Sequence, residues 1–97
     1  MALSSDTETP EAIPYFCWDA PTTNRTIRAA LRDGTDAEKL HWIARIMSEA
    51  KYADVWRYLS LENDVMPRWD LLQRRLGRMG RFWQYLVAGW KADGLLT

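Results

Sequence analysis

The single histidine, the single cysteine and a pair of nearby glycines are the residues whose chemistry could support catalysis. His41 would act as a general acid or base, but no second histidine offers a metal pair, so an ordinary solvated histidine is favoured. Cys17 follows aromatic residues and precedes Trp18 and Asp19, surroundings that disfavour a thiolate and favour a structural thiol. Gly77-Arg78-Met79-Gly80 lacks the Gly-Lys-Ser/Thr ending of a phosphate-binding loop. The sequence therefore predicts no catalytic residue, no cofactor and no metal site.

Positive charge gathers in the last third of the chain. Residues 67–97 carry six Lys and Arg against two acids, whereas residues 1–19 carry four acids and no base. Arginines among aromatic residues can bind phosphates, an acidic protein surface or the chain's own acids, and a solvated helix face is the plainest alternative. Because the formal net charge is zero, bulk attraction to nucleic acid is excluded and a protein partner is favoured over nucleic acid. The candidate contacts from this stretch are Trp69, Arg74, Arg75, Arg78 and Arg81.

Tryptophan is unusually frequent, with six in 97 residues. A small core cannot bury that many indole rings completely, because each is large and its N–H needs an acceptor. We expect Trp42 and Trp83 in the core, and Trp18 and Trp69 at a surface that binds a partner. The aromatic run near the N-terminus adds further candidate contacts, which are Tyr15, Phe16, Trp18 and Asp19.

The spacing of apolar residues predicts an all-α fold, a compact bundle of about four to five short helices. The first is expected over about 24–33, with Thr23 as N-cap and Gly34 as a left-handed stop. The second is expected over about 36–51, behind a capping box of Thr35 and Glu38. Later helical segments are expected over 53–58, about 61–66 with a break at Pro67, 69–76, and about 79–92 closed by Gly94.

The length of 97 residues fits one domain. Residues 1–13 are acidic and poor in large apolar groups, which predicts a disordered, mobile tail. Residues 14–97 are expected to form a single helical domain that begins with an extended aromatic segment between Pro14 and Pro21. No apolar run approaches the length of a membrane span, and one cysteine suits a reducing compartment. The prediction is a soluble, cytoplasmic protein that binds no membrane.

Four short motifs resemble a family of small bacterial proteins whose openings read Pro-Tyr-Phe-x-Trp-Asp. They are the run from Pro14 to Asp19, Leu40–Ile46, Asp54–Leu59, and Phe82-Trp83 with Gly89-Trp90. The resemblance spans roughly residues 14–92, and Cys17 stands where that family carries a larger apolar residue. Genes of the family often neighbour an AbiEii-like nucleotidyltransferase toxin. The resemblance therefore implies a bacterial toxin-antitoxin system in which this chain is the antitoxin or accessory partner.

Together these features predict a protein-binding module and not an enzyme. We expect the chain to cover the active-site cleft or substrate groove of a nucleotidyltransferase-type toxin, with acids of the tail or Asp19 meeting that enzyme's basic surface. One alternative is a nucleic-acid-binding regulator that uses the Arg68–Arg81 stretch. The other is a structural homodimer that buries the surplus tryptophans.

Overall fold

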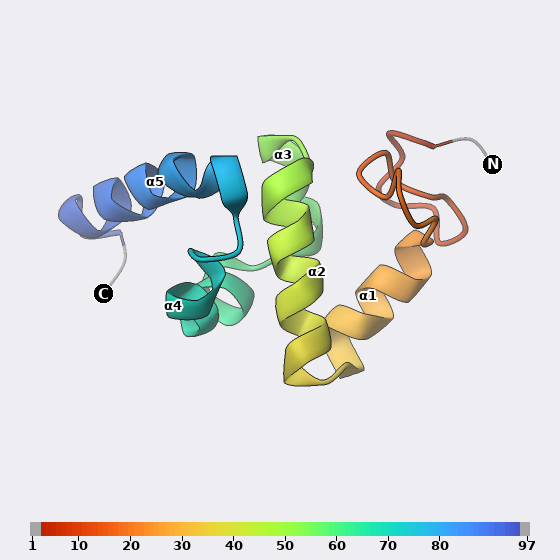
Figure 1. The fold of residues 1–97 in the computed structure, drawn as a ribbon, viewed down its shortest axis with the longest axis horizontal. Helices are drawn as coiled ribbons and strands as arrows, with labels where there is room; N and C mark the ends of the chain where they lie inside the picture. The colour runs from red at the N-terminus through yellow and green to blue at the C-terminus, as the bar shows by residue number, and fades with distance from the viewer. Residues whose placement is uncertain (1–2, 96–97) are drawn as a thin grey trace.

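A computed structural model describes residues 3–95, which contain no strand: an irregular N-terminal segment up to residue 23 precedes a series of helices (Figure 1). The α-helices are α1 (Asn24–Asp33), α2 (Asp36–Glu49), α3 (Tyr52–Tyr58), α4 (Trp69–Leu72) and α5 (Gly80–Ala92). Three short helical turns lie between them, η1 (Leu61–Val65), η2 (Met66–Arg68) and η3 (Gly77–Met79). The predicted all-α fold is confirmed. Residues 1–2 of the predicted tail and 96–97 of the predicted domain lie outside the described residues.

The first two helices begin at capped residues, as the sequence predicts. The Thr23 side chain accepts a hydrogen bond from the Thr26 amide, and Thr35 and Glu38 form the expected capping box. Gly34 separates the helices, but its φ of −70° is not left-handed, so the predicted left-handed stop is wrong. Glycine is needed there for space, because a Cβ would lie 2.5 Å from the Ala30 carbonyl oxygen.

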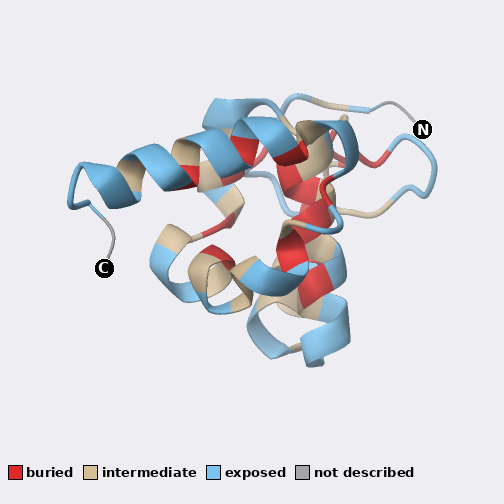
Figure 2. Cartoon of the chain, turned by 60° about the vertical axis from the view of Figure 1, so that its left-hand side comes forward, coloured by how far each residue is buried: buried red, intermediate tan, exposed pale blue. Residues whose placement is uncertain are grey.

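α2 forms the centre of the core. Figure 2 shows buried positions recurring along one side of this helix, as expected for an apolar stripe at helical spacing. Its buried side chains are Leu40, Ile43, Ala44, Ile46 and Met47. The other large side chains packed in this core come from every part of the described chain and include Phe16, Ile27, Val55, Val65, Leu72, Leu76 and Trp83. One helix therefore organises a core to which all the other segments contribute.

The chain between α3 and α5 follows an irregular helical path. Ser60 caps η1, a π-helical turn, and accepts a hydrogen bond from the Asn63 amide. At Met66 the path tightens into η2, and Pro67 lies at its start, where the missing amide hydrogen of proline is tolerated. The chain stays helical from η1 through α4, so the break or kink expected at Pro67 is a change of helix type without an interruption. α4 is shorter than the predicted 69–76 segment, although Leu76 beyond its end is buried.

α5 lies at one end of the molecule and is held by aromatic side chains (Figure 1). Trp83 is 1 % exposed, as predicted for a core residue. Its ring stacks on Tyr52 with centroids 5.8 Å apart, and Trp56 meets both Trp83 and Trp90 edge-on. Trp42, the other predicted core tryptophan, is only partly buried against the core. The contact between α3 and α5 is thus an aromatic cluster.

The N-terminal segment differs from the predicted disordered tail, because residues 3–13 pack against the start of α1. Thr7 and Ile13 are buried, and the Ser4 amide donates to the Ile13 carbonyl at 2.8 Å. Asn24 donates to the carbonyl oxygens of Asp6 and Thr9, and Arg28 donates to that of Thr7. Composition misses this order because main-chain carbonyls, which every residue carries, make the contacts.

Tyr15 fixes the extended aromatic segment to the region between α2 and α3. Its hydroxyl donates to Asp54 at 2.7 Å and accepts from the Lys51 amide at 2.7 Å. Burial raises the pKa of Tyr15 from 10.0 to about 12, and the Asp54 carboxylate acts in the same direction. Burial also raises the pKa of Tyr58. Both hydroxyls are therefore stabilised in their protonated forms by the fold.

We expect the protein to lose stability as the pH rises from 10 towards 12. Below pH 10 Tyr15 is protonated in both states, whereas between its ordinary pKa of 10.0 and the folded value of about 12 only the unfolded chain releases the proton. Urea denaturation across this range measures the loss, which Tyr15→Phe should reduce. Tyr85→Phe removes a hydroxyl from an exposed ring and is the control. A loss that is equally large in Tyr15→Phe contradicts the assignment.

Candidate functional site

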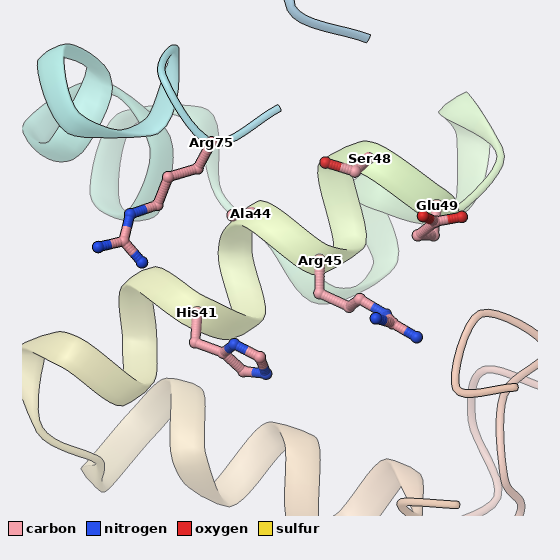
Figure 3. A pocket seen from close by; sticks show the side chains of 6 residues that line it. All are labelled: His41, Ala44, Arg45, Ser48, Glu49 and Arg75. Atoms are coloured by element: carbon pink, nitrogen blue, oxygen red, sulfur yellow. The ribbon is translucent and has the colours of Figure 1, made fainter. Parts of the chain in front are cut away.

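Three adjoining cavities lie along the polar side of α2, and we term them together the α2 groove. Its central cavity has a volume of about 400 Å³ and is lined by His41, Ala44, Arg45, Ser48, Glu49 and Arg75 (Figure 3). A cavity of about 90 Å³ adjoins it through the shared walls His41 and Arg45. Another, of about 220 Å³, adjoins it at the other end and extends to Gly77 and Arg78. The central cavity thus shares two lining residues with the first neighbour and three, Ser48, Glu49 and Arg75, with the second.

The first end of the groove is built by the aromatic segment that follows Pro14. Arg45 on α2 forms an ion pair with Asp19 and donates to the Phe16 carbonyl oxygen at 3.1 Å. The hydrogen bond from Arg45 lowers the pKa of the Asp19 carboxyl. The Arg45 guanidinium also lies 5.6 Å from the centroid of the Trp18 ring, which is 64 % exposed. Trp18 is therefore an exposed aromatic side chain supported by an arginine from a rigid helix.

The second end of the groove is built by the turn that connects α4 to α5. Gly77 has a φ of 55° there, a left-handed conformation that favours glycine. Arg75 and Arg78 on either side of it are exposed, and neither forms an ion pair with any residue from 3 to 95. Figure 3 shows the Arg75 side chain extending from this turn towards α2. Two guanidinium groups at this end are thus accessible to an acidic ligand.

The structure brings together four of the predicted partner contacts and separates the rest. Asp19 lines the first end of the α2 groove, Trp18 lies beside that end against Arg45, and Arg75 and Arg78 line the second end. Phe16 is 1 % exposed and belongs to the core, so its prediction as a partner contact is wrong.

The remaining predicted contacts lie outside the groove. The hydroxyl of half-buried Tyr15 is already hydrogen-bonded within the chain. Trp69 is half-buried against the core, whereas Arg74 is exposed but does not line the groove. Arg81 is exposed on α5.

Sequence reasoning assigns no partner contact to the four polar side chains that line the middle of the groove, which are His41, Arg45, Ser48 and Glu49. The available signal is helical spacing, because Glu38, His41 and Arg45 share the polar face of α2. That pattern also describes any solvated helix face. Only the docking of the aromatic segment against this face distinguishes it.

The groove offers polar and charged side chains for non-covalent contacts. Cys17 lines the smallest cavity, but burial raises the pKa of its thiol, which disfavours the reactive thiolate. Within residues 3–95 no group of three or more His, Cys, Asp or Glu side chains is placed to hold a metal ion. Over the same residues no helix combines the length and apolar character needed to cross a membrane.

Comparison with known protein families, with curated protein sequences and with solved structures finds no match to this chain. The side chains that line the α2 groove combine guanidinium groups, carboxylates and a hydroxyl, and the exposed Trp18 ring lies beside its first end. Aromatic and arginine side chains with a polar surround are typical of protein contact surfaces.

Proposed function

We propose that this chain is a protein-binding module that holds an acidic segment of a partner protein in the α2 groove. The observation that supports the proposal is the convergence of two segments far apart in sequence. The Trp18-Asp19 segment lies at one end of the groove, and the turn carrying Arg75 and Arg78 lies at the other. A partner that spans the groove would contact both.

The two ends contribute differently to binding. Carboxylates of the partner would accept charge-assisted hydrogen bonds from Arg75 and Arg78, which have no ion-pair partner among the described residues. At the other end the Trp18 ring would bury apolar area against the partner. Its position is restrained by Arg45, so little conformational freedom is lost on binding.

A nucleic-acid strand fits the same groove less well. Glu49 lines both the centre and the arginine end of the groove, so phosphate groups of a continuous strand would lie against its carboxylate. A peptide can alternate its own charges to match such a surface, whereas a phosphodiester chain cannot. The mixed charge of the groove therefore favours a protein partner.

For the class of partner we carry forward the implication of the resemblance, a nucleotidyltransferase-type toxin that this chain binds as antitoxin or accessory protein. The expected mode of contact differs from the sequence-based expectation, in which acids of this chain meet a basic surface of the partner. Asp19 pairs with Arg45, Glu8 lies 3.8 Å from Arg57, and Glu11 pairs with Arg25. Because these acids are engaged within the chain, the arginine end of the groove is the better candidate for the partner's charged segment.

We expect Arg75→Glu/Arg78→Glu to weaken binding of a labelled Asp- and Glu-rich peptide by at least about tenfold, since the change replaces attraction with repulsion. Trp18→Ala should weaken binding by a comparable factor through the other end of the groove. Fluorescence anisotropy measures both, and co-expression with a nucleotidyltransferase-type toxin, scored by growth rescue and co-purification, tests the partner class.

Arg74→Glu/Arg32→Glu is the matched control, because it makes the same change in charge at exposed arginines outside the groove. It should alter binding less than threefold at the same ionic strength. Equal weakening by both double variants would show that binding follows net charge and would contradict a site in the groove. Tighter binding of a single-stranded oligonucleotide than of the peptide would favour the nucleic-acid alternative.

A further inference from the structure

One side of α5 is exposed although it is largely apolar, and we term it the α5 outer face. At 3.6 residues per turn its members fall within about a third of the helix circumference. All are exposed, and Figure 2 shows exposed positions along most of this helix. They are Arg81, Phe82, Tyr85, Gly89, Ala92 and Asp93. The opposite side of the helix carries Trp83 and Val87, which are buried.

The α5 outer face has large residues in its first half and small residues in its second half. Tyr85 is 78 % exposed and Phe82 is 40 % exposed, so two aromatic rings protrude from the first half of the helix. Gly89 and Ala92 leave the second half flat, and a Cβ added at Gly89 would meet nothing within 4 Å. Glycine disfavours a helix interior, and no close contact within the chain requires it here. The flat half is therefore open to side chains from outside the chain.

The charges at the two ends of this face oppose the helix dipole. Arg81 lies in the first turn of α5, and Asp93 is its C-cap residue. A cation near the N-terminus and an anion near the C-terminus are each unfavourable for an isolated helix. Lys91, in the last turn, suits the dipole of α5, whereas Arg81 and Asp93 have no ion-pair partner among the described residues.

We propose that the α5 outer face binds the same face of a second copy of this chain, with the two helices antiparallel. The two-fold axis crosses the outer face at the level of Val87 along the helix. Tyr85 of each copy then lies over Gly89 of the other, and Phe82 lies over Ala92. The same register places Arg81 of each copy beside Asp93 of the other. Each contact occurs twice, as a two-fold interface requires. One arrangement thus accounts for the protruding rings, the flat half and the two charges.

The size of the face predicts a weak dimer. α5 has 13 residues and is about 20 Å long, so the pairing buries less than the roughly 800 Å² per partner of a standard interface. Tyr52, with its ring centroid 6.1 Å from that of Phe82, extends the apolar area beyond α5. We therefore expect a reversible dimer with a Kd on the order of micromolar. The face belongs to α5 and the proposed groove to α2, so the two proposals stand independently.

Sedimentation equilibrium of the full chain over a wide concentration range tests the dimer. Arg81→Asp and Asp93→Arg should each raise the dimer Kd about tenfold or more, because like charges then face each other. Combining the two changes in one chain exchanges the charges and should restore the wild-type Kd to within about threefold. Each single change favours the helix dipole, so weaker association cannot be attributed to a weakened α5, and circular dichroism verifies the helix content.

Lys91→Asp is the control, because it reverses an exposed charge of α5 that lies outside the outer face. It should leave the Kd unchanged within about threefold. Gly89→Leu fills the space assigned to Tyr85 of the other copy and should abolish the dimer, although it favours the helix. A wild-type chain that stays monomeric up to millimolar concentration overturns the proposal. So does a double charge variant that fails to recover, or a dimer that tolerates Gly89→Leu.

Discussion

Trp83→Ala is expected to lower the free energy of unfolding by about 3–5 kcal/mol, a large fraction of the stability of a small domain. The ring is buried between α2, α3 and α5, with Tyr52 stacked on it and the edges of Trp56 and Phe82 against it. Removing it leaves a cavity that these rings cannot close without losing their own contacts. Urea denaturation followed by circular dichroism measures the change.

The indole N–H of Trp83 adds a polar contribution to this effect. It donates to the Met47 carbonyl oxygen at 2.8 Å, in the last turn of α2, where carbonyls lack partners inside the helix. Trp83→Phe keeps most of the ring but leaves that carbonyl without its donor. We expect Trp83→Phe to lower the free energy of unfolding by about 2 kcal/mol, which is less than the effect of Trp83→Ala.

Trp18→Ala is the matched control, because it deletes the same side chain from a position that is 64 % exposed. It should change the free energy of unfolding by no more than about 0.5–1 kcal/mol, part of it from the lost contact with Arg45. A Trp18 variant that is destabilised as strongly as Trp83→Ala would contradict the division of these tryptophans into core and surface.

The helices could be predicted from the sequence because their signals are local. Thr23 and Thr35 cap the first two helices, Pro67 lies where the helical path changes, and the apolar stripe of α2 is the centre of the core. The error at Gly34 shows the limit of such signals. Glycine often ends a helix through a positive φ, whereas here the close approach of the Ala30 carbonyl requires it, and that contact depends on how α2 departs from α1.

The candidate site could be predicted only by residue type. Trp18 and Arg75 have the chemistry of interface residues, but their positions at two ends of one groove depend on contacts between distant segments. Phe16 and Trp18 belong to the same aromatic run, yet Phe16 is buried and Trp18 is exposed. Which ring of an aromatic run points inward is decided by packing, which residue types alone do not reveal.

One buried polar residue that no sequence pattern singles out contacts the N-terminal segment through its side chain. Asn24, at the first position of α1, is 0 % exposed. Its amide donates to the Asp6 and Thr9 carbonyl oxygens at 2.9 and 3.0 Å, and its own oxygen accepts from the Tyr58 hydroxyl at 2.6 Å. An asparagine at a helix start is ordinarily assigned to capping, whereas this one connects three parts of the chain.

We expect Asn24→Ala to lower the free energy of unfolding by roughly 3 kcal/mol, because it removes three hydrogen bonds and leaves their partners unpaired in a buried region. The N-terminal segment should also open locally before the core unfolds. A protease that cleaves after glutamate, at Glu8 and Glu11, should therefore cut the variant faster under native conditions. Mass spectrometry of the fragments identifies the cleaved bonds.

Asn63→Ala removes the same atoms from an exposed side chain that makes no hydrogen bond with the described residues, and it should change stability by no more than about 0.5 kcal/mol. Val65→Ala lowers stability through the core, far in sequence from the N-terminal segment, and supplies the comparison for proteolysis. If cleavage at Glu8 and Glu11 rises equally in Val65→Ala and Asn24→Ala, opening follows global stability and the Asn24 contacts do not hold the segment. Preferential cleavage in Asn24→Ala means that this residue couples the first residues of the chain to α1 and α3.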